Sequence, residues 1–370
     1  MSNAVILSVY YKHKQGGFTK RLYRAYKAIA GSGRKLIYIA TEKLPVDHEN
    51  IQPVIINMRS RENSPFYWPE FYLRAVLTMR RLTRQYDVST HFVFSFFYAS
   101  LSILAATGLP VRTITLIRGD DAFDANFKKF AGLRRSAHRM LEYIGVRGSS
   151  AVVATSQSMQ RAISERTGSD KISTLSNDIT TQALDVQSYQ QPETLRIATL
   201  SVINERKNLR LAIEALAELR QLPWEYLIIG PDTSNKNLAE ELKQLTKKLG
   251  IAERVKFLGW RDDTASLLKD CHLFLFPTLM EGSPNALMEA MGYGLPCLAS
   301  RIPEVTEVLQ NESLHFDPNS KRELTEKLRQ FMTDAQYVQQ VKEKTAADRK
   351  RYVFDWDNRI VQLLNTPEYA

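Results

Sequence analysis

Short apolar runs alternate with helix-like segments along the whole chain. In the first half, runs rich in β-branched and aromatic residues occupy positions 4–10, 35–40, 53–57, 90–95, 111–117 and 151–155. A second series occupies positions 195–201, 226–229, 255–258, 273–276, 296–299 and 313–316, again with amphipathic segments between the runs. Because strands that alternate with helices pair in parallel, the pattern predicts an α/β protein with two doubly wound, Rossmann-like sheets.

A polar stretch separates the two series. Residues 177–194 show no apolar period, and the Gln-rich segment 187–191 is followed by Pro192, which is typical of a linker. The stretch predicts a boundary near residue 185, with a first domain at 1–185, a second at 186–350 and a terminal helix within 351–370. Ligands of doubly wound sheets bind beyond the carboxyl ends of the strands, so we expect the two domains to face each other across a cleft lined by strand-to-helix loops.

The charge of the chain is unevenly divided. The 370 residues carry a formal net charge of +10, but residues 1–180 hold 26 Lys and Arg against 13 Asp and Glu, a balance of +13, whereas residues 181–370 hold 24 against 27, a balance of −3. The basic half predicts an anionic partner, either a membrane surface or a polyanionic substrate. A merely well-solvated surface is the alternative.

Cysteine usage and hydropathy indicate the compartment. Cys271 and Cys297 form no disulfide framework or zinc signature, which fits a reducing cytoplasm. No apolar stretch approaches the roughly 18 residues of a membrane span, and residues 1–11 lack the features of a signal peptide. These features predict a cytoplasmic protein, and the basic half adds the hypothesis of peripheral attachment to the inner face of the membrane.

The segment 276–296 carries the most informative motif. It starts at the end of an apolar strand, Ser283 is a typical helix cap, Pro284 suits the first helical position, and a helix is predicted from Asn285 onwards. Backbone N–H groups at such a helix start favour phosphate binding. The candidate donor-binding residues at this turn are Gly282, Ser283, Pro284, Asn285 and Ala286.

Two glutamates frame this turn. Glu281 precedes it and Glu289 lies inside the helix, where both carboxylates can accept hydrogen bonds from sugar and ribose hydroxyls. With Glu-Gly, Pro-Asn, Glu-Ala-Met and Gly-Leu-Pro in order, the segment resembles the signature of the retaining glycosyltransferases of family 4, whose GT-B fold has two Rossmann-like domains. The resemblance implies that Glu281 contacts the donor sugar and Glu289 the nucleotide ribose. Two structural helix glutamates are the alternative.

The resemblance also concerns the last helix of the chain. Residues 352–364, which include Trp356, form an amphipathic segment. In the GT-B fold the final helix crosses back to the N-terminal domain, and the resemblance implies the same here. An ordinary amphipathic terminal helix is the alternative.

Two cations in the second domain are candidates for charge stabilisation. Arg206 and Lys207 follow a strand and precede an amphipathic helix, where they can neutralise charge on a leaving diphosphate. The family has Gly-Arg where this chain has Ser201 and Val202. We therefore expect Arg206 and Lys207 to stabilise the charge of the diphosphate. A solvated helix start is the alternative. Gly230 ends the next strand, and the resemblance implies that its loop borders the nucleotide base.

The first domain supplies fewer candidates. Gly16 and Gly17 follow the first strand, where the family lets the backbone approach the donor phosphates; a plain turn is the alternative. Arg118 and Asp120 follow a later strand and match the family's loop near the reacting centre, which implies sugar or acceptor contacts. Asp120 and Asp121 lack the Asp-X-Asp spacing of metal-dependent transferases, and the histidines lack metal-ligand spacing. We therefore expect neither a metal site nor a cofactor.

These observations predict a reaction. The resemblance implies a metal-independent, retaining glycosyltransferase, a hexosyltransferase, that moves a sugar from a nucleotide diphosphate sugar to a hydroxyl of a glycan or lipid-linked acceptor. It also suggests a role in cell-envelope polysaccharide or lipopolysaccharide assembly. One alternative is a nucleotide-sugar 2-epimerase on the same fold. Another is a basic nucleic-acid-binding protein, but no nucleic-acid-binding module is present, so we expect no nucleic-acid partner.

Overall fold

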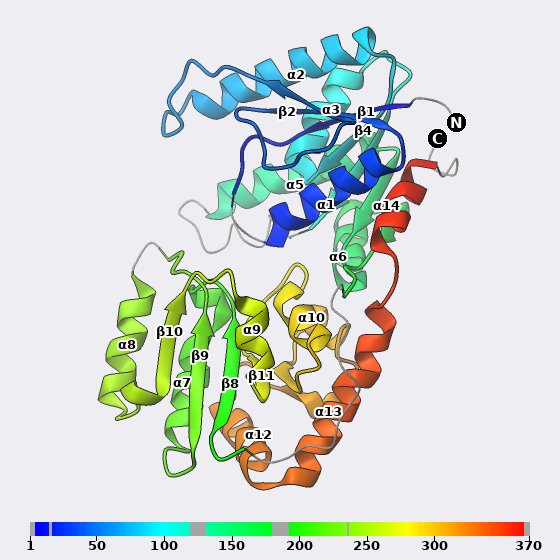
Figure 1. The fold of residues 1–370 in the computed structure, drawn as a ribbon. Helices are drawn as coiled ribbons and strands as arrows, with labels where there is room; N and C mark the ends of the chain where they lie inside the picture. Colours follow the sequence, from blue (N-terminus) through cyan, green and yellow to red (C-terminus); the bar gives the residue numbers. More distant parts are fainter. Residues whose placement is uncertain (1–3, 15–16, 119–130, 180–191, 235–236, 366–370) are drawn as a thin grey trace. The chain divides into compact units, whose positions relative to one another are not determined.

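The computed structural model describes residues 4–14, 17–118, 131–179, 192–234 and 237–365. The chain forms two compact units, one of Met1–Ser176 together with Asp355–Ala370 and one of Asn177–Phe354. Each unit is a parallel β-sheet covered by helices (Figure 1). The expected α/β fold with two Rossmann-like sheets is confirmed, and the expected boundary near residue 185 lies outside the described residues.

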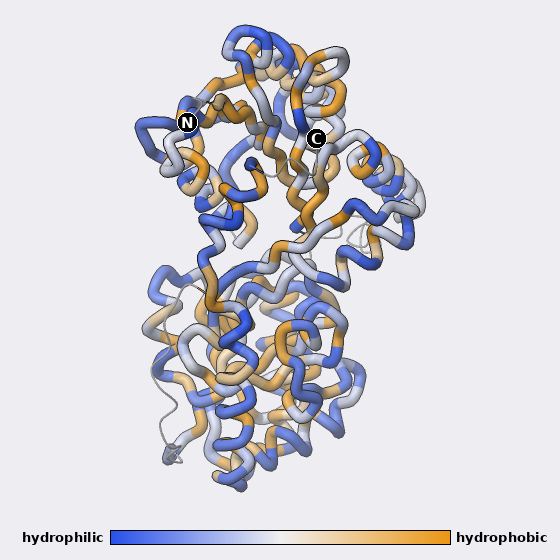
Figure 2. The backbone as a smooth tube through the Cα atoms, turned by 90° about the vertical axis from the view of Figure 1, so that its right-hand side faces the viewer, coloured by the Kyte–Doolittle hydropathy of each residue, from blue (hydrophilic) through white to orange (hydrophobic). Residues whose placement is uncertain are grey.

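The first unit is built on a sheet in the order β3-β2-β1-β4-β5-β6-β7, in which all neighbours are parallel. Its strands are β1 (Val5–Val9), β2 (Lys35–Ala40), β3 (Ile51–Ile55), β4 (Val88–Phe94), β5 (Arg112–Ile117), β6 (Ala151–Ala154) and β7 (Ile172–Thr174). The central strands are apolar on both faces because helices cover both. Hydrophobic and hydrophilic stretches alternate along the chain in both units (Figure 2).

The helices of the first unit are α1 (Gly17–Gly31), α2 (Tyr67–Gln85), α3 (Phe96–Ala106), α5 (Ala131–Gly148), α6 (Gln157–Thr167) and α14 (Trp356–Asn365). Helix α3 packs against both α2 and α5. Helix α14, from the end of the chain, packs on α1, where Trp356 is buried beneath the guanidinium groups of Arg21 and Arg24. An ion pair of 2.6 Å between Arg24 Nε and Asp357 Oδ1 adds to this contact.

The second unit has the strand order β10-β9-β8-β11-β12-β13, again all parallel. Its strands are β8 (Leu195–Leu200), β9 (Trp224–Ile229), β10 (Val255–Gly259), β11 (Leu273–Phe276), β12 (Cys297–Ser300) and β13 (His315–Phe316). Its helices are α7 (Leu209–Ala217), α8 (Leu238–Lys248), α9 (Thr264–Lys269), α10 (Asn285–Gly292), α11 (Pro303–Thr306), α12 (Lys321–Thr333) and α13 (Ala335–Arg349). The reversal of strand order beside β8 places the loops after β8 and β11 next to each other.

The chain passes between the two units twice, once after Ser176 and once after Phe354. Within the second unit, the backbone N–H of Ile179 donates a 2.8 Å hydrogen bond to the carbonyl oxygen of Tyr352. The segments that enter and leave this unit are therefore bound to each other. In the part of the chain that the structure describes, no helix has the length and apolar character needed to cross a bilayer.

A buried histidine makes the stability of the first unit depend on pH. His91 on β4 is fully buried and shares hydrogen bonds with the hydroxyl groups of Thr83, at 2.8 Å, and Ser102, at 2.9 Å. Burial lowers the pKa of His91 to about 4, because the charged imidazolium would lose its hydration. The unfolded chain binds this proton below a pKa of about 6.5, so the histidine's contribution to stability is lost as the pH falls from about 6.5 towards 4.

We expect the free energy of unfolding of the wild type to fall by about 2 kcal/mol more between pH 7.5 and pH 5 than that of His91→Gln, which cannot titrate. Urea unfolding at the two pH values measures this difference. Carboxylates that titrate in the same range contribute equally to both proteins. An identical pH dependence of the two proteins would mean that His91 accepts its proton in the folded state.

Candidate active site

Two loops meet at the carboxyl ends of β8 and β11, which are neighbours in the sheet. The loop after β8 contains a 3-10 turn at Glu205–Lys207, which is capped by Asn204, whose side-chain oxygen accepts a 3.3 Å hydrogen bond from the N–H of Lys207. The carbonyl oxygen of Arg206 accepts a 2.8 Å hydrogen bond from the N–H of Leu279 in the other loop. This backbone contact fixes the two loops side by side.

Glu281 lies at the centre of this arrangement. Its side chain is 7% exposed, and it accepts hydrogen bonds from Lys207 Nζ and, at 3.0 Å, from the hydroxyl of Thr278. Arg206 completes the cluster, with Nη1 at 3.6 Å from the second carboxylate oxygen. Glu281 is thus brought together with the candidates Lys207, which lies 74 residues away in sequence, and Arg206.

The two cations of the cluster differ in their surroundings. The Lys207 side chain is 10% exposed and its ammonium group lies 5.4 Å from the centre of the Phe276 ring, whereas the Arg206 side chain is 25% exposed and donates to the carbonyl oxygen of Met280 at 3.2 Å. Lys207 is therefore not part of a solvated helix surface. Two positive charges facing one carboxylate leave a positive excess, which suits an anionic ligand.

The start of α10 differs from the sequence prediction. The helix begins at Asn285, but Ser283 does not cap it: Pro284, expected at the first helical position, is the residue before the helix, and no side chain caps the helix start. The Ser283 hydroxyl instead accepts a 2.7 Å hydrogen bond from the side-chain amide of Asn177, which also bonds to the side chain of Asn285. The hydroxyl is thus held by Asn177 and not by the helix backbone.

Glu289 lies farther along α10 in a separate polar group. The hydroxyl of Thr264, the first residue of α9, donates to Glu289 Oε1 at 3.4 Å. Burial and the charge of Glu289 raise the pKa of Tyr293. Glu281 therefore precedes α10 and Glu289 lies inside it, in the order that the sequence motif has.

Gly230 lies where two strand ends approach closely. It has a φ of +144° and forms a bridge with Gly259, to whose carbonyl oxygen it donates a 2.8 Å hydrogen bond. A Cβ atom at this position would lie 2.1 Å from the carbonyl oxygen of Ser201 and 2.6 Å from its carbonyl carbon. A glycine is therefore required here by both conformation and space. Gly230 and Ser201 lie at the carboxyl ends of β9 and β8, beside the loop that carries the cations.

The candidates of the first unit are only partly described. Gly17 is the first residue of α1, and Arg118 directly follows β5. Burial and the nearby charge of Arg21 lower the pKa of Arg118 to about 9. Gly16 and Asp120, like Asp121, lie outside the described residues.

Sequence reasoning missed three polar residues of the second unit. Thr278 follows the apolar strand β11 directly, and this change from apolar to polar at a carboxyl end was a usable signal. Asn177 lies 106 residues from Ser283, so no local pattern connects the two, and Thr264 carried no signal. Over the described ranges, no three His, Cys, Asp or Glu side chains form a cluster suited to a metal ion.

Two Rossmann-like units define the architecture of a GT-B protein, and the second unit has paired cations and one glutamate at its strand ends and another glutamate on α10. Comparison with protein families agrees: the model of the "Glycosyl transferases group 1" matches residues 182–348, and that of "Glycosyltransferase Family 4" matches residues 15–182. The chain therefore belongs to the group 1 glycosyltransferases and has the GT-B fold.

Individual relatives are more distant. The chain is 26% identical over 252 residues to the serotype-specific mannosyltransferase WbdA of Escherichia coli, a match that covers 64% of this chain and 30% of the relative. It is 25% identical over 301 residues to N-acetyl-alpha-D-glucosaminyl L-malate synthase of Bacillus anthracis, covering 77% and 76%. The chain thus spans less than a third of the length of the first relative and about three quarters of the second.

A solved structure shares the fold. Anabaena HepE in complex with UDP-glucose superposes with a TM-score of 0.74 at 18% identity, over 98% of this chain and 99% of that one. At this identity the likeness concerns the fold alone.

Proposed function

We propose that the protein transfers a hexose from a nucleotide diphosphate sugar to a hydroxyl group of a glycan or lipid-linked acceptor, in the assembly of cell-envelope polysaccharide or lipopolysaccharide. The observation that carries this proposal is the buried cluster of Glu281, Lys207 and Arg206 beside the start of α10. Its place in the family motif supports a sugar donor, and the names of the mannosyltransferase and the N-acetyl-alpha-D-glucosaminyl L-malate synthase support the transfer of a sugar.

The positive excess of the cluster suits the leaving group of such a reaction. As the bond between the anomeric carbon and the diphosphate oxygen breaks, negative charge develops on the diphosphate, and Lys207 and Arg206 would stabilise it. Glu281 holds both cations in place before the donor arrives, so little reorganisation is needed at that moment. We assign Glu281 to the donor sugar and Glu289, with Thr264, to the nucleotide ribose.

We further propose that transfer occurs with retention and without a metal ion. The acceptor oxygen would attack the same face of the sugar that the diphosphate leaves, and the acceptor proton would pass to a phosphate oxygen of the leaving group. Family membership supports retention, and the two fixed side-chain cations support a mechanism that needs no bound metal. We place this activity in the cytoplasm, at the inner face of the membrane, which the basic first half of the chain supports.

Incubation with a panel of nucleotide sugars and glycan acceptors tests the proposal, after stabilisation by each donor has been measured as a rise in melting temperature. A product whose anomeric configuration matches that of the donor, formed equally well in excess EDTA, is expected. Inversion of configuration would overturn retention, and loss of activity in EDTA that Mg²⁺ or Mn²⁺ restores would overturn metal independence. An epimerised nucleotide sugar formed without acceptor would overturn transfer itself.

The assignment of Glu289 to the ribose makes a separate prediction. Glu289→Gln keeps the size of the side chain but removes the charge, so donor affinity should fall about 10- to 150-fold, which corresponds to a charged hydrogen bond of about 1.5–3 kcal/mol. Calorimetric titration with the donor measures this change. Glu326→Gln, at an exposed position on α12, is the control and should bind as the wild type does. Unchanged affinity in folded Glu289→Gln would remove Glu289 from the donor site.

A further inference from the structure

An exposed row of apolar and basic side chains runs along α2. Phe66, which precedes the helix, is 71% exposed, Leu73 is 60% exposed and Leu77 is 59% exposed. These three residues and Arg84 are spaced by seven, four and seven positions, so the helical period places all four on one line. Large apolar side chains aligned on the outer side of a helix are typical of a binding surface.

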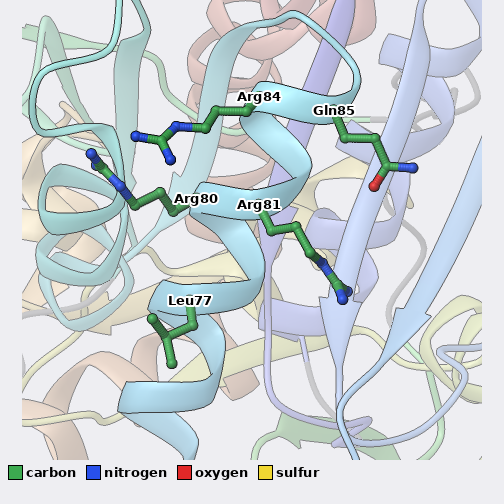
Figure 3. Close-up of a pocket in the computed structure, with 5 residues that line it drawn as sticks. All are labelled: Leu77, Arg80, Arg81, Arg84 and Gln85. Atoms are coloured by element: carbon green, nitrogen blue, oxygen red, sulfur yellow. The ribbon is translucent and has the colours of Figure 1, made fainter.

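The C-terminal end of this row is basic. A hollow of about 500 Å³ is lined by Leu77, Arg80, Arg81, Arg84 and Gln85, whose side chains are drawn in Figure 3. Arg80 links α2 to the end of α3, because its guanidinium group donates hydrogen bonds to the carbonyl oxygens of Ala105 and Thr107, at 3.1 and 2.7 Å. Arg81 and Arg84 are exposed, and their guanidinium groups point to different sides of the helix, so together they can reach two separate anions (Figure 3).

Helix α5, on the other side of α3, repeats the combination. Met140 and Tyr143 are exposed beside the exposed Arg139 and Arg147, and the Arg147 guanidinium lies 5.2 Å from the centre of the Tyr143 ring. Together the exposed residues of α2 and α5 form what we call the α2–α5 face. It comprises Phe66, Leu73, Leu77, Arg81, Arg84, Arg139, Met140, Tyr143 and Arg147.

Acidic side chains do not balance this charge. The acidic residues of the two helices are Glu70 and Glu142, and each is engaged by an arginine, Glu70 by Arg74 at 2.6 Å and Glu142 by Arg166 at 2.8 Å. The α2–α5 face therefore presents positive charge and apolar side chains together.

We propose that the α2–α5 face is the surface by which the protein docks on a bilayer that contains anionic phospholipid. A polyanionic glycan could pair with the arginines but would leave Phe66, Leu73 and Leu77 in water. A bilayer interface offers phosphate groups to the arginines and an acyl boundary to the apolar side chains. The inference rests on the proposed function in that a lipid-linked acceptor would be held at the same surface, but docking itself requires no turnover.

Sedimentation with vesicles tests the proposal. The wild type should sediment at low salt with vesicles of equal parts phosphatidylglycerol and phosphatidylcholine, should not sediment with phosphatidylcholine alone, and should be released at high salt. Each arginine near an anionic leaflet contributes about fivefold to binding, so Arg81→Glu/Arg84→Glu should weaken it at least about thirtyfold. Leu73→Ser/Leu77→Ser should weaken it about tenfold by removing inserted apolar surface.

A control variant separates this surface from net charge. Lys243→Glu/Arg322→Glu, on α8 and α12 of the second unit, changes the net charge by the same four units at exposed positions and should bind within about twofold of the wild type. Circular dichroism and urea unfolding establish that each variant is folded. Should a glutamate variant unfold, Arg81→Gln/Arg84→Gln replaces it, with the thirtyfold loss still expected.

Three results would overturn the proposal. The first is a wild type that does not bind anionic vesicles at low salt. The second is vesicle binding by the α2 variants that equals that of the wild type. The third is a loss of vesicle binding in the control variant as large as that in the α2 variants. Sugar transfer to a water-soluble acceptor, measured in parallel, should be unchanged in all variants. If the wild type binds vesicles but transfers no sugar, the proposed function is wrong and the docking surface is supported. If it transfers sugar but does not bind vesicles, the docking proposal is wrong and the proposed function is supported.

Discussion

A protein in which Lys207 is replaced by methionine is expected to turn over the sugar donor at least about a hundredfold more slowly than the wild type. Removal of one preorganised hydrogen-bond donor that faces a developing negative charge typically lowers the rate by a factor of about 10²–10³. Lys207 is nearly buried, and its ammonium group bonds to Glu281 and lies over the Phe276 ring. Methionine retains the length of the side chain but not its charge, which leaves Arg206 alone to meet the diphosphate. The rate constant at saturating donor measures the loss.

The same substitution leaves the buried Glu281 carboxylate with Arg206 at 3.6 Å and the Thr278 hydroxyl but without its ammonium partner, so the free energy of unfolding should also fall, by about 3 kcal/mol. A second change, Glu281→Gln, removes this incompletely paired charge, and Lys207→Met/Glu281→Gln should recover most of the stability while remaining slow. Lys321→Met, which breaks an exposed pair with Glu218 in the same unit, should leave turnover within about twofold of the wild type. Turnover that returns together with stability in the double variant would mean that Lys207 serves the fold and not the reaction.

Gly230→Ala is expected to destabilise the second unit by at least about 3 kcal/mol, because overpacking and backbone strain act at the same atom. The new methyl group would lie 2.1 Å from the backbone oxygen of Ser201, and backbone cannot swing aside as a flexible side chain can. Relief would require β8 and β9 to separate at their carboxyl ends. The midpoint of urea unfolding reports the change.

Its hydrogen-bonded partner Gly259 provides a matched control. Gly259 also has a positive φ, of +64°, but no atom lies within 4 Å of the place where its Cβ would be built. Gly259→Ala should therefore cost only about 1 kcal/mol, the strain of the left-handed conformation alone. Equal losses for the two variants would show that the close approach to Ser201 is easily relieved.

The sequence pattern predicted the strands well because the buried strands of a parallel sheet are nearly continuous apolar runs. It located β2 and β11 at their observed bounds and missed β7, which is three residues long and contains the polar Ser173 and Thr174. Candidate residues of the second unit were likewise found by their place at strand ends. That Lys207 and Glu281 pair with each other could not be predicted, since the alternation of strands and helices does not tell that β8 and β11 are neighbours.

Other features depended on contacts that no local pattern encodes. Ser283 is a residue type that commonly caps helices, but its hydroxyl accepts a hydrogen bond from the side-chain amide of Asn177, more than a hundred residues away. Arg80 looks like one more surface cation of α2, and only the position of α3 reveals that it bonds to the last carbonyl oxygens of that helix. In both cases a polar side chain with an ordinary local role is recruited by a distant segment.

The double passage of the chain between its units limits the ways in which the two can move. A single connecting segment would allow rotation about all three axes. Here the two connecting segments are hydrogen-bonded to each other through Ile179 and Tyr352. Rotation that bends both segments together keeps this bond, whereas rotation that twists one segment around the other would break it. The same feature means that a protease that cuts after Ser176 leaves the second unit covalently attached to α14, and the packing of α14 on α1 then keeps the two fragments together.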